Sequence, residues 1–582
     1  MVLLPLEAWG PVLLVLYTGP ASEEFLSHSP AVPAKVRKYE GDKMKFPATG
    51  VGVERALVQN SGPTLGRASL DTDPGLEIPR AIMARYWVTI SLIMAFSLFR
   101  NSPLLAKATL APVFSDHMVL QCGQPIPVWG IASPGEAVTI TLGKETLRTV
   151  ADPAGHWLVR LAARQATDQP ATLVITASNT LSVGDILIGE VWICSGQSNM
   201  HWPLRLAANG EKEVNSAQLP NLRLLNLRGS PYPSGREFSP RDRENSVPRK
   251  YQTGGWAVCT PQTIPEFSAV AFFFGRELYG KMNIPIGLIH NSVGGTPTES
   301  WISRSALLAD PALRPILSNW PENELISSFC RKRAGMNLAG FTQGLAGGSM
   351  CHPYQPGFMY ESAIGPLAPF AMRGVIWYQG ESNTHNPMLH DRLFSTLVGQ
   401  WREVWGQGDF PFLFVQLPNL AGAEDWPGFR ASQLRALRIP NTGMAVTIDI
   451  GDPGDVHPPA KEEVGHRLAL LARDIAYGEK IESSGPMLRD IKAAGKDLRL
   501  GFSRVTGGLA TRDKKDPTGF EVAGIDMKFA PAMARIEANE IAVFSPGIAE
   551  PVAVRYGFAP NPRCTVVNGA GLPASPFEAH VK

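Results

Sequence analysis

The chain has 582 residues, enough for roughly three or four domains. Its 54 Lys and Arg nearly balance 52 Asp and Glu, and the two signs are interspersed, which argues against a nucleic-acid-binding groove or a basic membrane-binding surface. The 56 Gly and 50 Pro follow no short period and are typical of many turns that join strands.

A segment with the pattern of a secretory signal peptide lies inside the chain. Residues 83–108 begin at Met83, contain the largely apolar run Val88–Phe99, and end in the small-x-small sequence Ala106-Lys107-Ala108. We therefore interpret 83–108 as a signal peptide and residues 1–82 as a gene-start artefact without ordered structure. The apolar run is too short to span a bilayer. We expect a mature chain without a membrane span that is secreted or periplasmic.

The cysteines are widely separated in the sequence. Their spacing excludes the CxxC pairs of zinc sites and thioredoxin-like redox sites. Export would permit disulfides, so the sequence leaves open whether the thiols are paired or free. We expect no metal and no organic cofactor.

Two segments of short, alternating strands flank the middle of the chain. Residues 109–185 include the strand patterns Val138–Leu142 and Thr172–Ala177, separated by Gly- and Pro-containing turns, and predict an N-terminal β-sandwich module. Residues 482–582 return to short strands with Gly and Pro turns. This pattern predicts a second, C-terminal β module.

Between them, residues 186–481 alternate apolar strands with helical stretches. Strands that are apolar on both faces and alternate with helices predict a parallel sheet covered on both sides. The predicted strands are Ile186–Ile193, Ile284–Ser292, Gly374–Tyr378, Phe410–Leu417 and Met444–Ile450, and the predicted helices include Phe267–Met282 and Arg392–Trp405.

Residues that could take part in catalysis follow four of these five strands. Ser198 stands at a strand-to-helix turn, Gly294 lies in a Gly-Gly turn, amides and a carboxylate occupy 379–383, and His457 precedes a helix. Each feature alone is more commonly structural, a helix cap or a tight turn. Because ligands of open α/β sheets bind beyond the carboxyl ends of the strands, we expect these residues to meet.

Together they supply the groups that transfer of an acyl group to water requires: an alcohol, an imidazole, a carboxylate and donors for the oxyanion. The sequence therefore predicts an ester hydrolase in which Ser198 is the nucleophile and His457 the base.

Four segments resemble the characteristic blocks of the sialate O-acetylesterases within the SGNH hydrolase superfamily. They are GEVWICSGQSNM (Gly189–Met200), IGLIHNSVGGTPTESW (Ile286–Trp301), VIWYQGESN (Val375–Asn383) and DVHPPAKEEVGHRLAL (Asp455–Leu470). The resemblance extends over residues 109–582 and does not include 1–82. It implies an α/β fold in which a flavodoxin-like parallel sheet, the SGNH esterase domain, is flanked by the two β modules.

The resemblance also implies an oxyanion hole formed by the backbone of Ser198, by Gly294 and by an amide side chain of the third block. A serine stands where that block normally carries its asparagine, so we expect Gln379 to supply the amide, with Asn383 as the alternative. The superfamily's acid lies three residues before the histidine, where this chain has a glycine. Asp455 is therefore the preferred carboxylate and Asp452 the alternative.

The expected function is that of a secreted serine esterase that removes O-acetyl groups from carbohydrate hydroxyls through an acyl-enzyme intermediate. Two alternatives remain open on the sequence. One is an esterase that acts on acetyl xylan or another hemicellulose, and the other is a non-catalytic carbohydrate-binding protein whose Trp residues stack on sugar rings.

Overall fold

The computed structural model describes residues 107–341, 351–423 and 425–581. The predicted artefact 1–82 and nearly all of the predicted signal peptide lie outside these ranges. No helix within the described ranges is long and apolar enough to cross a membrane. Cys122, Cys194, Cys259 and Cys330 are buried free thiols.

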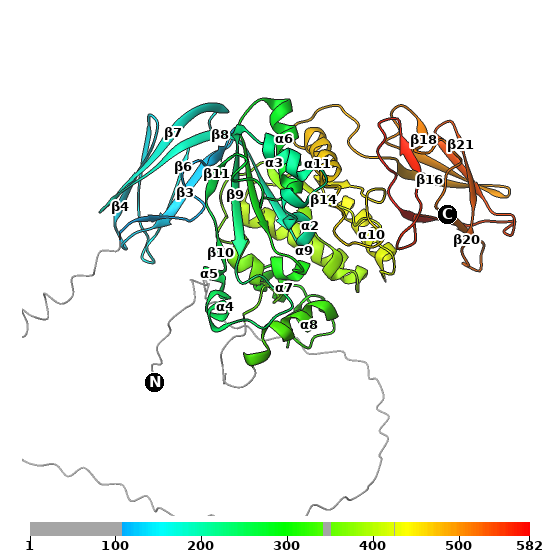
Figure 1. The fold of residues 1–582 in the computed structure, drawn as a ribbon, viewed down its shortest axis with the longest axis horizontal. Coiled ribbons are helices and arrows are strands. Elements are labelled where there is room, and N and C mark those ends of the chain that lie inside the picture. The colour runs from blue at the N-terminus through cyan, green and yellow to red at the C-terminus, as the bar shows by residue number, and fades with distance from the viewer. Residues whose placement is uncertain (1–106, 342–350, 424, 582) are drawn as a thin grey trace, which may run out of the picture. The chain divides into compact units, whose positions relative to one another are not determined.

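A predominantly parallel sheet forms the centre of the chain (Figure 1). Its parallel strands are hydrogen-bonded in the order β9-β12-β8-β13-β14-β15, and two short strands, β10 and β11, pair antiparallel with β9. The bounds are β8 Thr180–Gly196, β9 Leu219–Gly229, β10 Gln252–Thr253, β11 Trp256–Cys259, β12 Ile286–Ser292, β13 Gly374–Tyr378, β14 Phe412–Val415 and β15 Thr442–Ala445. The mixed α/β architecture is confirmed.

Helices cover both faces of this sheet, as the alternation of side chains along a strand requires. Trp192 and Cys194 of β8 pack in one core with α6 (Ala269–Met282) and α11 (Lys461–Ile475). The intervening Val191 and Ile193 pack in the opposite core with α9 (Pro387–Trp405).

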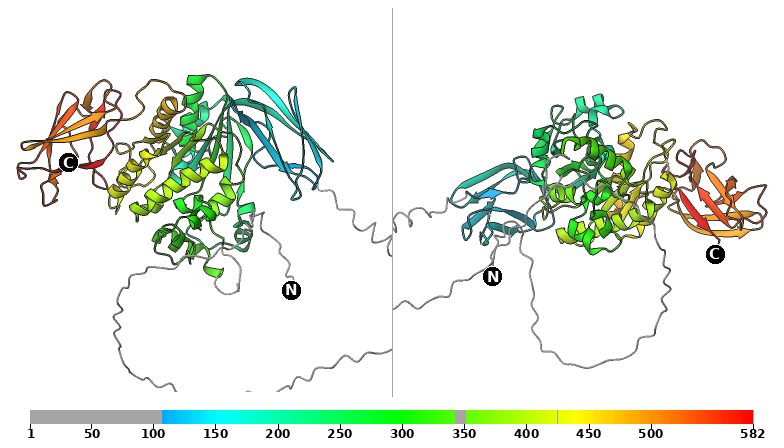
Figure 2. Two further views of the ribbon diagram at one scale, coloured as in Figure 1. Left: turned by 180° about the vertical axis from the view of Figure 1, so that it is seen from behind. Right: turned by 90° about the horizontal axis from the view of Figure 1, so that it is seen from below.

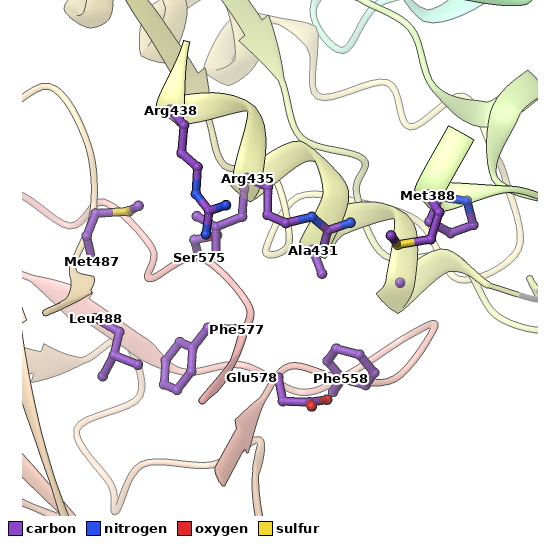
Figure 3. A pocket seen from close by; sticks show the side chains of 13 residues that line it. Met388, Ala431, Arg435, Arg438, Met487, Leu488, Phe558, Ser575, Phe577 and Glu578 are labelled. Carbon is purple, nitrogen blue, oxygen red and sulfur yellow. The ribbon is translucent and has the colours of Figure 1, made fainter. Parts of the chain in front are cut away.

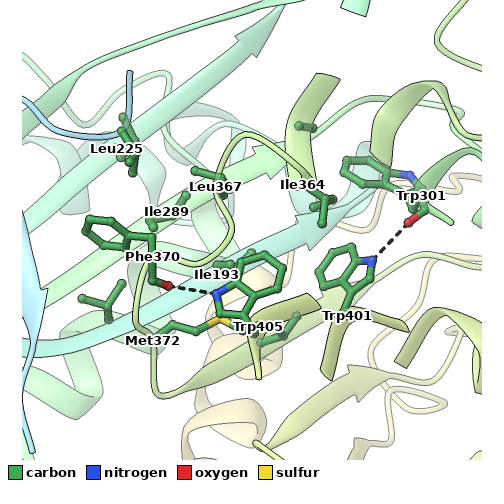
Figure 4. Packing of buried hydrophobic residues seen from close by; sticks show 14 of the residues in the cluster. Ile193, Leu225, Ile289, Trp301, Ile364, Leu367, Phe370, Met372, Trp401 and Trp405 are labelled. Carbon is green, nitrogen blue, oxygen red and sulfur yellow. Dashed lines mark hydrogen bonds between the residues drawn. The ribbon is translucent and has the colours of Figure 1, made fainter. Parts of the chain in front are cut away.

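Two indole groups tie the second core to the loops around it. Trp401 donates from Nε1 to the carbonyl of Trp301 at 3.0 Å, and Trp405 donates from Nε1 to the carbonyl of Phe370 at 2.8 Å (Figure 4). Both rings are therefore packed without leaving a buried donor unpaired. The remaining helices are α2 Ser198–His201, α3 Gly210–Ser216, α4 Pro240–Asn245, α5 Pro248–Tyr251, α7 Arg304–Ala309, α8 Ser328–Asn337 and α10 Trp426–Arg435.

The N-terminal module shares a strand with the central sheet. The first part of β8 pairs with β7 (Thr167–Thr176) and β2 (Val119–Gln121), and its last part runs between β12 and β13 (Figures 1 and 2). The predicted boundary after residue 185 therefore falls inside one strand. The other strands of this module are β1 Thr109–Leu110, β3 Ile126–Ile131, β4 Ala137–Leu142, β5 Glu145–Val150 and β6 His156–Leu161.

The C-terminal module consists of antiparallel sheets around its own core. One sheet has the order β16-β17-β22-β21, another β20-β19-β23-β25, and β18 pairs with β24. The bounds are β16 Met487–Ala494, β17 Asp497–Ser503, β18 Leu509–Thr511, β19 Phe520–Ala523, β20 Ala530–Pro531, β21 Met533–Glu537, β22 Glu540–Phe544, β23 Ala553–Tyr556, β24 Val566–Asn568 and β25 Phe577–His580.

Replacing Gly196 by alanine should destabilise the central sheet. Gly196 has φ 139°, and a Cβ there would lie 2.1 Å from the carbonyl oxygen of Tyr378 on the neighbouring strand. We expect the free energy of unfolding to fall by about 2 kcal/mol or more, measured by urea denaturation.

The matched control is Gly399→Ala, an exposed position within α9 where a Cβ would meet no atom within 4 Å. Helix propensity predicts a gain of up to about 1 kcal/mol there. Equal effects of the two substitutions would contradict the steric account of Gly196.

Candidate active site

The residues that follow three neighbouring parallel strands line one cavity of about 400 Å³. Ser198 follows β8, Gly294 follows β12 and Glu381 follows β13, and His457 reaches the same cavity from the loop between β15 and α11. The carboxyl ends of parallel strands meet at one edge of a sheet, so these segments converge although they are far apart in sequence.

Ser198 and His457 are directly hydrogen-bonded. The distance between Ser198 Oγ and His457 Nε2 is 2.8 Å. With its proton on Nδ1, the neutral imidazole accepts from the serine hydroxyl and can remove its proton as the oxygen attacks an electrophile. The ring of Trp202 stacks on His457 with centroids 5.1 Å apart and holds the imidazole plane.

The two candidate carboxylates differ in position. Asp455 Oδ1 lies 3.8 Å from His457 Nδ1 and accepts the backbone N–H of His457 at 2.8 Å. Asp452 Oδ1 instead accepts the N–H of Gly454 at 2.8 Å, and no contact between Asp452 and His457 occurs among the described residues. The geometry favours Asp455, although 3.8 Å is longer than a hydrogen bond.

Charge and burial around His457 favour the neutral ring. Burial lowers the pKa of His457, the positive charge of Lys461 lowers this pKa further, and Asp455 acts in the opposite direction. A base that is neutral at physiological pH is ready to accept the nucleophile's proton.

A buried polar network that the sequence analysis missed lies beside the nucleophile. Asn199 donates from Nδ2 to Glu381 Oε1 at 2.5 Å and to the carbonyl of Val456 at 2.9 Å, and it accepts a hydrogen bond from Lys461 Nζ. One amide thus joins the Ser198 turn, the loop after β13, the His457 loop and the start of α11.

The network contains two buried ionisable groups of opposite sign. Burial lowers the pKa of Lys461 to about 7, while the carboxylates of Glu381 and Asp455 oppose this shift. Burial raises the pKa of Glu381. Lys461 Nζ also lies 5.5 Å from the ring centroid of Tyr378 and 5.8 Å from that of Trp202, where the π faces stabilise a cation.

The backbone at Gly294 is suited to face an oxyanion. A Cβ at this position would lie 1.9 Å from Tyr232 Oη, so the close approach of Tyr232 requires glycine here, and it would lie 3.5 Å from Ser198 Cβ, so the turn is also in van der Waals range of the nucleophile. Among the described residues, no hydrogen bond engages the Gly294 N–H.

The expected amide donor does not lie at the cavity wall. Gln379 is buried and donates from Nε2 to Asn383 Oδ1 at 2.7 Å and to the carbonyl of Thr296 at 3.3 Å. Asn383 donates to Glu299 Oε2 at 2.9 Å. Both amides therefore hold the loops together behind the cavity. Ser382 lines the cavity instead, and its hydroxyl donates to the carbonyl of Gly295 at 2.9 Å.

Comparisons with known proteins agree on one family. Residues 331–473 match the family model described as carbohydrate esterase, sialic acid-specific acetylesterase. The sialate O-acetylesterase of Rattus norvegicus is 30% identical over 81% of this chain and 94% of its own length, and that of Homo sapiens is 29% identical over 85% and 97%. The crystal structure of a carbohydrate acetylesterase from Xanthomonas citri is 34% identical, covers 82% of this chain and 100% of its own, and has a TM-score of 0.68.

Asparagine substitution of the two aspartates should separate their roles. We expect Asp455→Asn to lower turnover of 4-nitrophenyl acetate by at least about a hundredfold, because the group that orients the imidazole is lost, whereas Asp452→Asn stays near wild type. Near-normal rates in both variants would instead indicate a Ser–His pair held by Trp202 stacking alone. A loss of turnover confined to Asp452→Asn would show that Asp452, and not Asp455, orients His457.

Removing the charge of Lys461 should move the pH profile. In Lys461→Met the pKa of His457 rises because a nearby positive charge is gone, so the acid limb of kcat/KM shifts to higher pH. The measurement is hydrolysis of 4-nitrophenyl acetate between pH 5 and 9. Lys480→Met, at an exposed lysine absent from the network, is the control and should leave the limb in place. An unshifted or acid-shifted limb in Lys461→Met would contradict this coupling.

Proposed function

Because the chain belongs to the sialate O-acetylesterase family and is thus a carboxylic ester hydrolase, we propose that it removes O-acetyl groups from the hydroxyls of a sialic acid through an acyl-enzyme intermediate. The observation that carries the mechanism is the 2.8 Å hydrogen bond between Ser198 and His457 inside the cavity. The SGNH-type arrangement of the catalytic domain remains part of the proposal, supported by the site at the carboxyl edge of the parallel sheet.

Ser198 Oγ attacks the acetyl carbonyl carbon as His457 Nε2 takes the hydroxyl proton. The backbone N–H groups of Ser198 and Gly294 stabilise the oxyanion of the tetrahedral intermediate. Collapse breaks the ester C–O bond, and His457 returns the proton to the departing sugar oxygen. Water then attacks the acetyl-Ser198 ester with His457 again as base, and release of acetate restores the free serine.

Arg333 supports an acidic sugar as the substrate. Its side chain lines the cavity, donates from Nη1 to the carbonyl of Pro233 at 3.2 Å, and lies over the ring of Phe329 at 5.2 Å. Among the described residues no carboxylate forms an ion pair with it. The carboxylate of a sialic acid would form an ion pair with this guanidinium, whereas neutral acetylated xylan has no carboxylate to pair with it.

The aromatic lining supports a sugar ring beside the ester. Tyr232, Phe329, Tyr354 and Trp426 all contribute to the cavity wall. The C–H face of a sugar packs well against aromatic faces.

Export of the protein through the segment 83–108 remains a proposal that is based on the sequence pattern alone.

The test compares O-acetylated N-acetylneuraminic acid with acetylated xylobiose. Ser198→Ala should reduce acetate release from either ester by at least about a thousandfold while the protein stays folded. Arg333→Ala should lower kcat/KM for the sialic acid ester by about ten- to a hundredfold and change that for acetylated xylobiose less than about threefold.

Lys332→Ala, at an exposed cation beside Arg333 on α8, is the matched control and should affect neither substrate. Faster turnover of acetylated xylobiose by the wild type, with no effect of Arg333→Ala, would favour the hemicellulose alternative. Full activity of a folded Ser198→Ala variant would contradict the assignment of Ser198 as the nucleophile.

A further inference from the structure

A second cavity, of about 620 Å³, lies where the catalytic domain meets the C-terminal module (Figure 3). One wall comes from α10 and the turn that follows it, with Arg435 and Arg438. The other comes from the C-terminal module, with Leu488 of β16 and Phe577 of β25. This cavity shares no residue with the one at Ser198.

Buried hydrogen bonds fix the two walls to each other. Arg430 of α10, fully buried, donates from Nη1 to the carbonyl of Ala559 and from Nη2 to that of Pro560, each at 2.9 Å. Gln416 Nε2 donates to Ser575 Oγ at 3.2 Å. The cavity therefore belongs to a joined, hydrogen-bonded interface and has a defined shape.

The charge in this cavity is positive. Arg435 uses its Nε to pair with Asp391 at 2.8 Å, and its terminal nitrogens form no hydrogen bond or ion pair with any described residue. Arg438, three residues later, is exposed and has no ion pair or hydrogen bond within the described part of the chain. The carboxylate at the rim, Glu578, is already neutralised by Arg555 at 2.6 Å.

Apolar side chains face these guanidinium groups. Phe577 is 4% exposed and lines the cavity near Leu488, and Phe558 lines it on the other side of Glu578 (Figure 3). Met388 at the rim is 74% exposed. An unpaired cation opposite apolar and aromatic surface matches a ligand that combines a carboxylate with a C–H-rich ring.

We propose that this cavity is a second carbohydrate site that binds a carboxylated sugar of the acetylated glycan, with Arg438 as the carboxylate partner. The choice of a sugar rests on the proposed function, whereas the preference for an anion rests on the local charge alone. Binding here would hold a polymeric substrate near the enzyme between successive deacetylations and so raise its effective concentration.

The binding test uses full-length protein that carries Ser198→Ala and Arg333→Ala, so that turnover is removed and binding of an acidic ligand at the catalytic cavity is weakened. Titration calorimetry would compare a sialylated oligosaccharide, a glucuronic acid-substituted xylo-oligosaccharide and a neutral xylo-oligosaccharide. We expect one site for at least one of the two acidic ligands, and which of them binds identifies the source of the carboxylate. The neutral ligand should bind at least about tenfold more weakly.

Adding Arg438→Ala should weaken acidic-ligand binding by about tenfold or more, whereas Arg438→Lys should retain most of it. The control is Arg160→Ala in the N-terminal module, at an exposed arginine that forms no ion pair with any residue the structure describes, and it should retain all of the binding. Equal affinity of the Arg438→Ala variant, equal binding of the neutral ligand, or no binding of either acidic ligand would overturn the proposal.

A kinetic measurement separates this proposal from the proposed function. In a chain with native Ser198, Arg438→Ala should leave kcat/KM for a monomeric acetylated sugar unchanged and raise KM for a polymeric acidic glycan severalfold. Loss of activity on the monomer would show that Arg438 acts on the catalytic cavity and would refute a separate site. Failure of the wild type to release acetate from any sugar would refute the proposed function and leave the calorimetric result standing.

Discussion

The hydrogen bonds of Asn199 are the constraint on which the arrangement of the active site depends. The loops that carry the nucleophile and the base come from strands β8 and β15, which lie at different positions in the sheet. Asn199 binds the carbonyl of Val456, the residue just before His457, and follows Ser198 directly in the chain. Its amide therefore sets the spacing between the two catalytic loops. The hydrogen bond from Asn199 to Glu381 also holds the loop after β13 against them.

Burying two ionisable groups beside a catalytic base has a cost in solvation that the surrounding residues offset. Lys461 is fully buried, yet it is hydrogen-bonded to Asn199, close to Glu381, and flanked by the rings of Tyr378 and Trp202. The same indole that faces this cation stacks on His457. Trp202 thus contacts both the buried cation, which affects the pKa of His457, and the imidazole ring itself, whose orientation it holds.

Much of this arrangement follows from local patterns in the sequence. Ser198 and His457 could be predicted because each follows an apolar strand at a turn, and parallel strands bring such turns together. Strand β9 was missed because the polar residues interspersed in LPNLRLLNLRG weaken the apolar signal at this outer position in the parallel order. The position of the Gln379 side chain could not be predicted, because sequence order does not reveal that it turns toward Thr296 and Asn383. Lys461 and Arg333 lie on helices, where a charged residue ordinarily indicates a solvated face, and only the tertiary fold brings them to the site.

The long strand β8 also bears on how the chain acquires its structure during synthesis. Its first part pairs with β2 and β7, both of which precede it in the sequence, so these partners are already available when β8 leaves the ribosome. Its last part, which leads to Ser198, pairs with β12 and β13, which are made later. The N-terminal module can therefore serve as a template that presents an anchored but half-paired strand, and β13, β14 and β15 can add on one side of it in the order in which they emerge. On the other side β9 emerges before β12, which separates it from β8, so β9 can join the sheet only after β12 has been made.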